Sequence, residues 1–476
     1  MSKFGKLINR FQILLFLIPI ALIGQKTDFA KEWKNDKGLR GASLAYCVMD
    51  AKTASVLSEY NAAEQMIPAS TLKIVSTTGA LQILGTDFRY ATKLLYTGTL
   101  SANGTLNGDI IILGSGDPTL QSEKFGAGSV TDFWAQKIKE KGIKEIQGKI
   151  IGNAACFDHV VPDDWIWADI SNYFGAVPCG LSYRDNKFKL YFNSGAAGTK
   201  TSLEKIWPDY LDKKFKVENE VLAGGNEDEA YVYGNPFGFS KIIKGTLPAN
   251  KTNYEVEAAL PDPALLCAQE LYLSLNKIGI TCDKNKVLSD YEGKDTANVH
   301  LIYTQYSPSL DKIIFHTNLS SNNLYCESLV KTLGKGNSTK GIERIKKHFS
   351  ERGLYTDQLY MVDASGLSRA NTITVAFQTQ LLSKIYRDSS TYQIINASLP
   401  VSGKSGSMSN MGKGSAIENN LRAKTGYIKR CRAYCGYVKS KSGKDLAFSI
   451  IFNNYNCSAR EAKLKIEKWM IEMENL

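Results

Sequence analysis

The spacing of apolar and polar residues changes along the chain and predicts different kinds of structure in different stretches. Near the start, residues 42–50 and 55–60 have the pattern of two hairpin strands, after a short helix at residues 28–37. The apolar spacing after residue 70 then predicts a helix that ends at Gly85. Helix and strand signals therefore alternate at this end of the chain.

From about residue 90 to residue 300 the pattern becomes a series of short alternating segments separated by Gly, Asn, Asp and Pro. Such segments are typical of short strands joined by turns, so we expect a mostly β region. One helix interrupts it at residues 263–278, where leucines recur on one helical face.

Helical spacing returns after residue 300 and gives way to strand signals near the end. Helices are predicted at residues 309–333, 340–352 and 374–387, strands at residues 421–427, 432–439 and 446–453, and a last helix at residues 459–473. The simplest organisation is one α/β (α+β) domain that a large β-rich insertion splits in two.

The first 24 residues have the pattern of an export signal. Basic residues precede an apolar run at residues 11–23, and Gly24 offers a small residue for cleavage. Leu22 occupies a place where a small residue is usual, so an uncleaved anchor and a peripheral association with the membrane stay open. No other apolar run approaches the length of a membrane span. We therefore expect an exported protein.

Composition narrows the classes of partner and cofactor. At 476 residues the chain has room for about three domains. Its formal charge is +11, but the excess is spread out, so we expect no nucleic-acid partner. A polyanionic wall or a substrate carboxylate is the more natural partner of such a surface.

The nine cysteines cannot all pair within one chain, and no C-x-x-C motif is present. Cys431 and Cys435 have no histidine beside them, so neither a zinc site nor another cofactor is expected. Cys47, Cys267 and Cys326 sit in apolar segments and are interpreted as small core residues. Disulfide pairing stays open.

Candidate chemistry begins with Ser70-Thr71-Leu72-Lys73, an S-x-x-K motif. Positions i and i+3 are neighbours across one helical turn, so this spacing brings a hydroxyl nucleophile and an amine onto one face. A lysine shielded from water can be neutral enough to take the serine proton. Because Pro68 and Ala69 precede it, Ser70 is predicted to open the helix, where backbone N–H groups favour a developing oxyanion. One such motif also occurs by chance in many helices.

Two further motifs follow in order. Ser321-Asn322-Asn323 lies at a predicted bend between helical stretches, where a hydroxyl and an amide can relay a proton, although Ser and Asn also serve as ordinary helix caps. Lys424-Thr425-Gly426 lies on a predicted edge strand and supplies a cation, a hydroxyl and a glycine that permits close approach. The order S-x-x-K, S-x-N, K-T-G, each in its setting, is the informative observation.

In this order and setting the motifs resemble those of the penicillin-recognising serine enzymes. Ser321 follows Ser70 by about 250 residues, far more than in class A β-lactamases, and the β-rich region fills the gap. The chain is therefore similar to the DacB group of D-alanyl-D-alanine carboxypeptidases and endopeptidases, the penicillin-binding protein 4 type. Further similar stretches occur at residues 114–120, 306–310, 363–369 and 399–403.

The resemblance implies a penicillin-binding-protein/β-lactamase-like transpeptidase domain, in which helices flank an antiparallel sheet. We assign this serine peptidase domain to residues 25–92 and 304–476, after a signal peptide at residues 1–24. The insertion is expected to form domain II, at residues 93–180 and 256–303, and a nested β-rich domain III at residues 181–255.

The resemblance also implies acyl transfer on peptidoglycan stem peptides that end in D-Ala-D-Ala. Ser70 would attack the penultimate carbonyl with Lys73 as general base, and the N–H groups of Ser70 and Tyr427 would form the oxyanion hole. Ser321 would pass a proton to the departing amine, while Asn323 holds the substrate amide and Lys73. The same serine would be acylated by β-lactams.

The terminal carboxylate of the substrate would be bound by Lys424 and Thr425, beside Gly426. In this family an acidic residue, an aromatic residue five positions later and an arginine recognise a diaminopimelate side chain, and Asp169, Phe174 and Arg369 fit these positions. Asp169 also fits a simple helix cap. The chain departs from the family at Tyr427, where threonine or serine is usual, which bears on substrate preference.

Two other interpretations stay open. A β-lactamase or esterase could use the same residues, although the long insertion and the lack of a recognisable deacylating glutamate argue against it. A non-catalytic wall-binding or β-lactam-sensing module would keep the fold. The complete set of motif residues argues against such a loss of the catalytic site. We expect peptidoglycan muropeptides as partners and a location in the bacterial cell envelope, periplasmic or extracytoplasmic. The choice between carboxypeptidase and endopeptidase action is not determined by the sequence.

Overall fold

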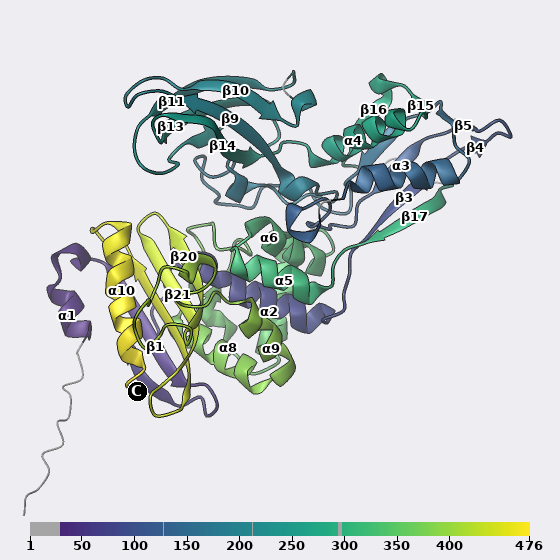
Figure 1. Cartoon of the computed structure of the whole chain (residues 1–476). Coiled ribbons are helices and arrows are strands. Elements are labelled where there is room, and N and C mark those ends of the chain that lie inside the picture. Colours follow the sequence, from purple (N-terminus) through teal and green to yellow (C-terminus); the bar gives the residue numbers. More distant parts are fainter. Residues whose placement is uncertain (1–28, 127, 212, 294–297) are drawn as a thin grey trace, which may run out of the picture.

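A computed structural model describes residues 29–126, 128–211, 213–293 and 298–476, and the predicted signal peptide lies outside these residues (Figure 1). Its centre is a five-stranded antiparallel sheet with the order β2-β1-β22-β21-β20. Both ends of the described chain therefore build one sheet. Its strands are β1 (Ser43–Asp50), β2 (Val56–Tyr60), β20 (Arg422–Ile428), β21 (Cys431–Lys439) and β22 (Asp445–Asn453).

The sheet is buried on both faces, which explains why β1 is an almost unbroken apolar run. Leu44, Tyr46 and Val48 face a cluster that includes α1 (Phe29–Asn35) and α10 (Ala459–Met473). Alternate residues such as Cys47 face the helices of the other side. The period of two along a strand sends neighbouring side chains to opposite layers. The chain thus forms a helix–sheet–helix sandwich, as the predicted fold class requires (Figure 1).

The helical layer on the second face carries most of the peptidase body. The layer consists of the helices α2 (Lys73–Leu84), α5 (Leu310–Leu319), α6 (Asn323–Leu333), α7 (Ser338–Ser350), α8 (Val375–Arg387) and α9 (Ser389–Ser398). A two-stranded ribbon, β18 (Leu359–Tyr360) with β19 (Thr372–Ile373), accompanies them. The predicted helical stretch at residues 309–333 is confirmed, with its bend at residues 320–322 between α5 and α6. The predicted helices near the end of the chain and the three final strands are confirmed as well.

The region between the two halves of the peptidase body is rich in strands, as predicted. One five-stranded sheet has the order β16-β8-β6-β3-β17 and a four-stranded sheet the order β15-β7-β5-β4. Their strands are β3 (Ala91–Tyr96), β4 (Thr99–Leu100), β5 (Thr105–Asn107), β6 (Ile110–Leu113), β7 (Glu145–Ile146), β8 (Ile150–Asn153), β15 (Thr281–Cys282), β16 (Val287–Asp290) and β17 (His300–Tyr306).

Two three-stranded sheets, β10-β9-β14 and β11-β13-β12, form the nested part of this region. They consist of β9 (Lys187–Ser194), β10 (Ser202–Trp207), β11 (Lys216–Ala223), β12 (Tyr231–Tyr233), β13 (Ser240–Leu247) and β14 (Lys251–Ala259). One cluster of buried apolar residues runs through both the nested sheets and the outer ones. Strand β14 crosses the boundary that we placed at residues 255 and 256, so the division into two insertion domains stays a prediction.

Two helices were not predicted. The insertion contains α3 (Val130–Glu140) besides α4 (Pro263–Lys277), and our expectation of one interrupting helix was wrong. The signal was present, because Thr131, Trp134, Ala135 and Ile138 are buried at helical spacing. The other helix, α9, is rich in Ser, Thr and Asn, which are poor helix formers. Asp388 is its N-cap residue, and its side chain accepts a hydrogen bond from the N–H of Thr391.

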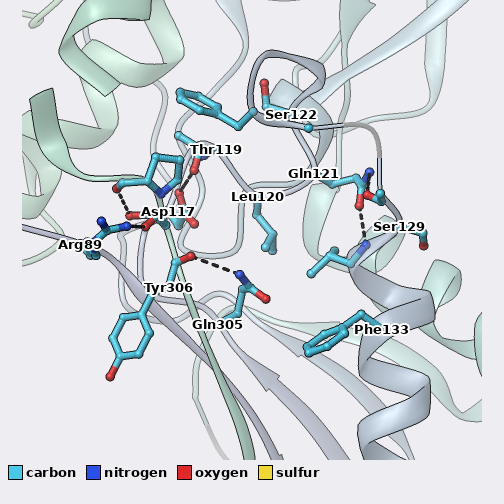
Figure 2. Close-up of a pocket in the computed structure, with 16 residues that line it drawn as sticks. Arg89, Asp117, Thr119, Leu120, Gln121, Ser122, Ser129, Phe133, Gln305 and Tyr306 are labelled. Atoms are coloured by element: carbon cyan, nitrogen blue, oxygen red, sulfur yellow. Dashed lines mark hydrogen bonds between the residues drawn. The ribbon is translucent and has the colours of Figure 1, made fainter. Parts of the chain in front are cut away.

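A cavity of about 410 Å³ lies where the insertion joins the peptidase body (Figure 2). Leu120 and Phe133 line its apolar part, and Arg89 and Asp117 line its polar part. Arg89 is engaged in the junction itself, since its guanidinium donates a 2.8 Å hydrogen bond to the Ser307 carbonyl. No predicted site residue borders this cavity, so we interpret it as part of the connection between the two regions.

Within the described ranges, none of the helices combines the length and the apolar character that crossing a membrane requires.

Candidate active site

The Ser70 hydroxyl lies in a tight turn immediately before a buried helix. Ser70 belongs to a short 3-10 helix, η2 (Ala69–Leu72), and α2 continues from it at Lys73. Ala69 is fully buried and has a φ of 46°, in the left-handed region that favours glycine. Non-glycine residues in this conformation are costly and concentrate at functional sites. Our prediction that Ser70 opens the α-helix needs this correction, because the chain turns at Ala69 before α-helical bonding begins.

Lys73 lies one turn after Ser70, and its side chain is completely buried. Its Nζ donates hydrogen bonds to Ser70 Oγ at 3.0 Å, to Asn323 Oδ1 at 2.6 Å and to the Ser365 carbonyl at 2.8 Å. Asn323 begins α6, so the first two motifs meet at this amine. All three acceptors are uncharged oxygens, which stabilise an ammonium ion less than a carboxylate would. The arrangement suits an amine that must exchange a proton with Ser70.

Lys424 and Ser321 form a second pair of amine and hydroxyl. Lys424 is fully buried on β20, the edge strand of the sheet, as predicted. Its Nζ donates to Ser321 Oγ at 2.9 Å and to the Thr425 carbonyl at 2.8 Å. Ser321 has a φ of 56°, which turns the chain sharply between α5 and α6. The third motif is therefore joined to the second through a direct contact.

The rest of the third motif lies against the Ser70 turn. A Cβ atom at Gly426 would come within 2.7 Å of the Pro68 carbonyl, so a larger residue would push strand and turn apart. Thr425 Oγ1 lies 2.7 Å from Ser407 Oγ. Tyr427, the residue that follows Gly426 on β20, is 53% exposed. Hydroxyl and backbone groups thus border the position of Ser70 from the strand side.

Burial dominates the electrostatics of the two lysines. Desolvation lowers the pKa of Lys73, and Cys326, Asp363 and Glu327 act in the opposite direction. Desolvation lowers the pKa of Lys424 well below its usual value, and the charge of Lys73 lowers it further. Two buried amines that repel each other favour a state in which one of them has lost its proton. Lys73 is the amine that is placed to act as the base, because its Nζ contacts Ser70 Oγ.

The three residues predicted to recognise a substrate side chain come from separate parts of the chain. Phe174 contacts the catalytic motif through its backbone, since Asn323 Nδ2 donates to the Phe174 carbonyl at 2.7 Å. Burial raises the pKa of Asp169, and the Arg369 guanidinium counteracts it, so these two side chains interact electrostatically. Arg369 also donates to the Lys429 carbonyl at 3.1 Å. Phe174 is thus linked to Asn323, and Asp169 interacts with Arg369, while the recognition role of the three residues stays a prediction.

The structure also reveals site residues that the sequence did not identify. The carbonyl of Ser365 binds Lys73, and the hydroxyl of Ser407 contacts Thr425. The sequence had marked the stretch at residues 363–369 as similar to the family, but no local signal shows which backbone atom would face Lys73. In the part of the chain that the structure describes, no group of three or more His, Cys, Asp and Glu residues could hold a metal ion.

Comparison with known proteins places this geometry in context. The family model described as D-Ala-D-Ala carboxypeptidase 3 (S13) matches residues 27–475. A D-alanyl-D-alanine carboxypeptidase of Actinomadura sp. (strain R39) is 27% identical over 440 residues, covering 88% of this chain and 79% of that protein. The crystal structure of penicillin-binding protein 4 (dacB) from Haemophilus influenzae superposes with a TM-score of 0.79 at 21% identity, covering 94% of this chain and 99% of that one. The same protein complexed with a β-lactam gives a TM-score of 0.73 at 19% identity, with 94% and 99% coverage.

The lowered pKa of Lys73 predicts the pH dependence of Ser70 acylation. Protonated Lys73 cannot accept the Ser70 proton, so the rate should rise with pH along a limb centred below the ordinary lysine value of 10.5. The acylation rate of Lys73→Arg should be at least roughly 100-fold lower than that of the wild type at every pH, because a guanidinium stays protonated. Rapid-mixing measurement of acylation by a chromogenic penicillin between about pH 5 and pH 10 tests this.

Lys439→Arg, an exposed lysine at the end of β21, is the matched control and should leave the profile unchanged. A rate that is still rising about tenfold per pH unit at pH 10, as it would with a limb centred at or above 10.5, would contradict the assignment of Lys73 as the base.

Proposed function

The chain belongs to the D-Ala-D-Ala carboxypeptidase 3 (S13) family, and on this premise we propose how its residues perform the reaction. The protein is a serine-type D-Ala-D-Ala carboxypeptidase, a hydrolase. The observation that supports the residue roles best is the pair of contacts from Lys73 Nζ, at 3.0 Å to Ser70 Oγ and at 2.6 Å to Asn323 Oδ1.

In the acylation step, Ser70 Oγ attacks the carbonyl carbon of the penultimate D-alanine while neutral Lys73 takes the hydroxyl proton. The negative charge that develops on the carbonyl oxygen is stabilised by the N–H groups of Ser70 and Tyr427. These groups are fixed before the substrate arrives, because Ser70 lies in η2 and Tyr427 in β20. The tetrahedral intermediate then collapses as the C–N bond to the terminal D-alanine breaks.

The departing amine needs a proton, and Ser321 is placed to supply it. Its hydroxyl accepts a hydrogen bond from Lys424 Nζ at 2.9 Å, so a proton that Ser321 gives to the leaving D-alanine can be replaced from Lys424. Thr425 and Lys424 bind the carboxylate of that terminal residue. Water then attacks the acyl-enzyme, Ser70 Oγ recovers its proton from Lys73 as the acyl C–O bond breaks, and the proton lost by the water returns to Lys424 through Ser321.

Peptidoglycan stem peptides are the proposed substrate, and β-lactams the proposed covalent inhibitors. The strained β-lactam amide offers Ser70 the same kind of carbonyl as the D-Ala-D-Ala bond, and the related Haemophilus influenzae protein has been crystallised with a β-lactam. The acylated residue in this chain would again be Ser70. Cleavage of D-Ala cross-links, an endopeptidase reaction, uses the same chemistry with a larger leaving amine.

Replacement of Ser70 tests the proposed reaction directly. The chain from residue 25 onward should release D-alanine from a muropeptide ending in D-Ala-D-Ala and carry a penicilloyl adduct on Ser70, located by peptide mass mapping. Ser70→Ala should lose the adduct, and its rate of D-alanine release should fall at least roughly 100-fold, because the hydroxyl that contacts Lys73 Nζ is removed.

Ser442→Ala, at an exposed turn, is the control and should behave as the wild type. An adduct on another residue, or D-alanine release by Ser70→Ala at the wild-type rate, would disprove the mechanism. Incubation with cross-linked muropeptides in the same series decides whether endopeptidase action accompanies carboxypeptidase action.

A second test concerns recognition of the substrate side chain by Asp169, Phe174 and Arg369. Asp169→Ala and Arg369→Ala should each lower kcat/KM for a diaminopimelate-containing peptide roughly tenfold, because each removes the charge opposite the amine or the carboxylate of that side chain. Turnover of a simple acyl-D-Ala-D-Ala should stay within about twofold. Asp163→Ala, an exposed carboxylate of the same segment, is the control. Equal losses on both substrates would disprove the recognition role.

We also propose that the protein is exported to the cell envelope through residues 1–24. Cell fractionation should place the full chain outside the cytoplasm and a chain lacking residues 1–24 inside it. The N-terminus of the exported protein, determined by sequencing, distinguishes a cleaved signal from a retained anchor. Full-length chain in the cytoplasm would contradict export.

A further inference from the structure

The segment that carries Asp169 and Phe174 contacts the peptidase body at both of its ends. We define this recognition loop as residues 165–174. At its start, Trp165 Nε1 donates to Asp363 Oδ2 at 2.8 Å. At its end, the Phe174 carbonyl accepts a hydrogen bond from Asn323 Nδ2 at 2.7 Å. The insertion therefore reaches the peptidase body at two points that the proposed side-chain recognition does not require.

The contact at Trp165 completes the hydrogen bonding of a buried carboxylate. Asp363 is fully buried, and each of its oxygens accepts two hydrogen bonds. The donors are Trp165 Nε1, the backbone N–H groups of Gly366 and Ser368, and Asn371 Nδ2. A buried carboxylate that loses one of four donors is destabilised and its turn is loosened. Three of the donors are local to the turn, and only Trp165 comes from the insertion.

The turn that Asp363 organises holds the catalytic amine. It begins at Asp363, and the Ser365 carbonyl two residues later accepts a 2.8 Å hydrogen bond from Lys73 Nζ. Glu327 of α6 holds the same turn from behind, by accepting the N–H groups of Ala364 and Ser365 at 3.1 Å and 2.8 Å. The position of Ser365, and with it one of the three contacts of Lys73, depends on this double anchoring.

The contact at Phe174 also affects the position of Lys73 Nζ, through Asn323. Asn323 uses its amide nitrogen to bind the Phe174 carbonyl and its amide oxygen to bind Lys73 at 2.6 Å. The Phe174 carbonyl holds the Asn323 amide in the orientation that Lys73 needs, because an acceptor there requires the nitrogen on that side and leaves the oxygen facing the amine. Two of the three contacts of Lys73 are thus held by the recognition loop.

The middle of the recognition loop is hydrogen-bonded to the nested part of the insertion, in addition to the contacts of its two ends with the peptidase body. Ser171 Oγ donates to the Gly234 carbonyl at 2.9 Å. Asn172 accepts the N–H of Val232 at 2.9 Å through its side-chain oxygen. Gly175 closes the loop, and a Cβ there would come within 2.1 Å of the Asp169 carbonyl. The loop is therefore anchored in its middle as well as at its two ends.

We propose that the recognition loop is a positioning element of acylation: Trp165, through the Asp363 turn, and the Phe174 carbonyl, through Asn323, hold the groups that align Lys73 with Ser70. Trp165 is a positioning residue that touches no reacting atom. The proposal rests on the proposed function of Ser70 and Lys73. According to this proposal, the insertion is needed for the acylation step itself, whichever carbonyl compound acylates Ser70. Its role would then extend beyond recognition of one substrate side chain.

Acylation by a penicillin separates this role from side-chain recognition, because a penicillin carries no diaminopimelate side chain. Trp165→Phe keeps an aromatic ring in the buried position, removes the N–H donor and reduces the side chain by one ring. The acylation rate constant at saturating penicillin should fall roughly tenfold. The dissociation constant of the non-covalent complex should stay within about twofold, because the groups that bind the penicillin carboxylate are untouched.

Trp167→Phe is the matched control, since Trp167 lies two residues further along the same loop and is 59% exposed. Both of its constants should stay within about twofold of the wild type. Equal losses in the two variants, no loss in Trp165→Phe, or a loss confined to the dissociation constant would overturn the proposal.

Gly175→Ala tests the other end of the loop and decides the matter if Trp165→Phe fails to fold. Its added Cβ must displace the turn that presents the Phe174 carbonyl, so acylation should again fall roughly tenfold or more. Gly128→Ala, where a Cβ meets nothing within 4 Å, is the control. Unchanged acylation in Gly175→Ala would overturn the proposal. Absence of a wild-type adduct on Ser70 would instead refute the proposed function, so the two failures are distinguishable.

Discussion

Burial of two amines side by side is the constraint on which the rest of this site depends. Lys73 and Lys424 are both fully buried, and their hydrogen-bond acceptors are all uncharged oxygens. Removing an ammonium ion from water without an ion pair costs several kcal/mol, so proteins lower the pKa of such a group instead. The cost is tolerable only if the surrounding oxygens are held rigidly. The fold supplies that rigidity from four separate segments.

Those segments explain the interrupted organisation of the chain. The edge strand β20 carries Lys424, helix α2 carries Lys73, the bend before α6 presents Ser321, and the turn after Asp363 presents the Ser365 carbonyl. The insertion leaves the body after α2, which carries Lys73, and returns before α5, which leads into the bend that carries Ser321. A strand-rich unit rooted there can act on both motifs at once. Its contacts at Asp363 and Asn323 are of this kind.

Local periodicity was enough to predict the parts of the site that lie on regular elements. The helix after Ser70, the helical stretch at residues 309–333 and the final three strands all follow from apolar spacing, because each element buries one or both faces. The Ala69 turn and the α9 helix depend on tertiary contacts that override local preference. The contacts of Ser365 and Phe174 use backbone carbonyls, which every residue has, so side-chain identity carries no signal for them.

The strained turn at Ala69 completes this physical account. With a φ of 46°, Ala69 stores backbone strain immediately before the nucleophile, and its carbonyl lies where a Cβ at Gly366 would come within 1.9 Å. Gly366 belongs to the turn that Asp363 organises, so the turn behind Lys73 also supports the turn that carries Ser70. Nucleophile and base are therefore braced by one buried carboxylate. Relaxation of either turn would move the two reacting groups relative to each other, which explains why strain can persist there.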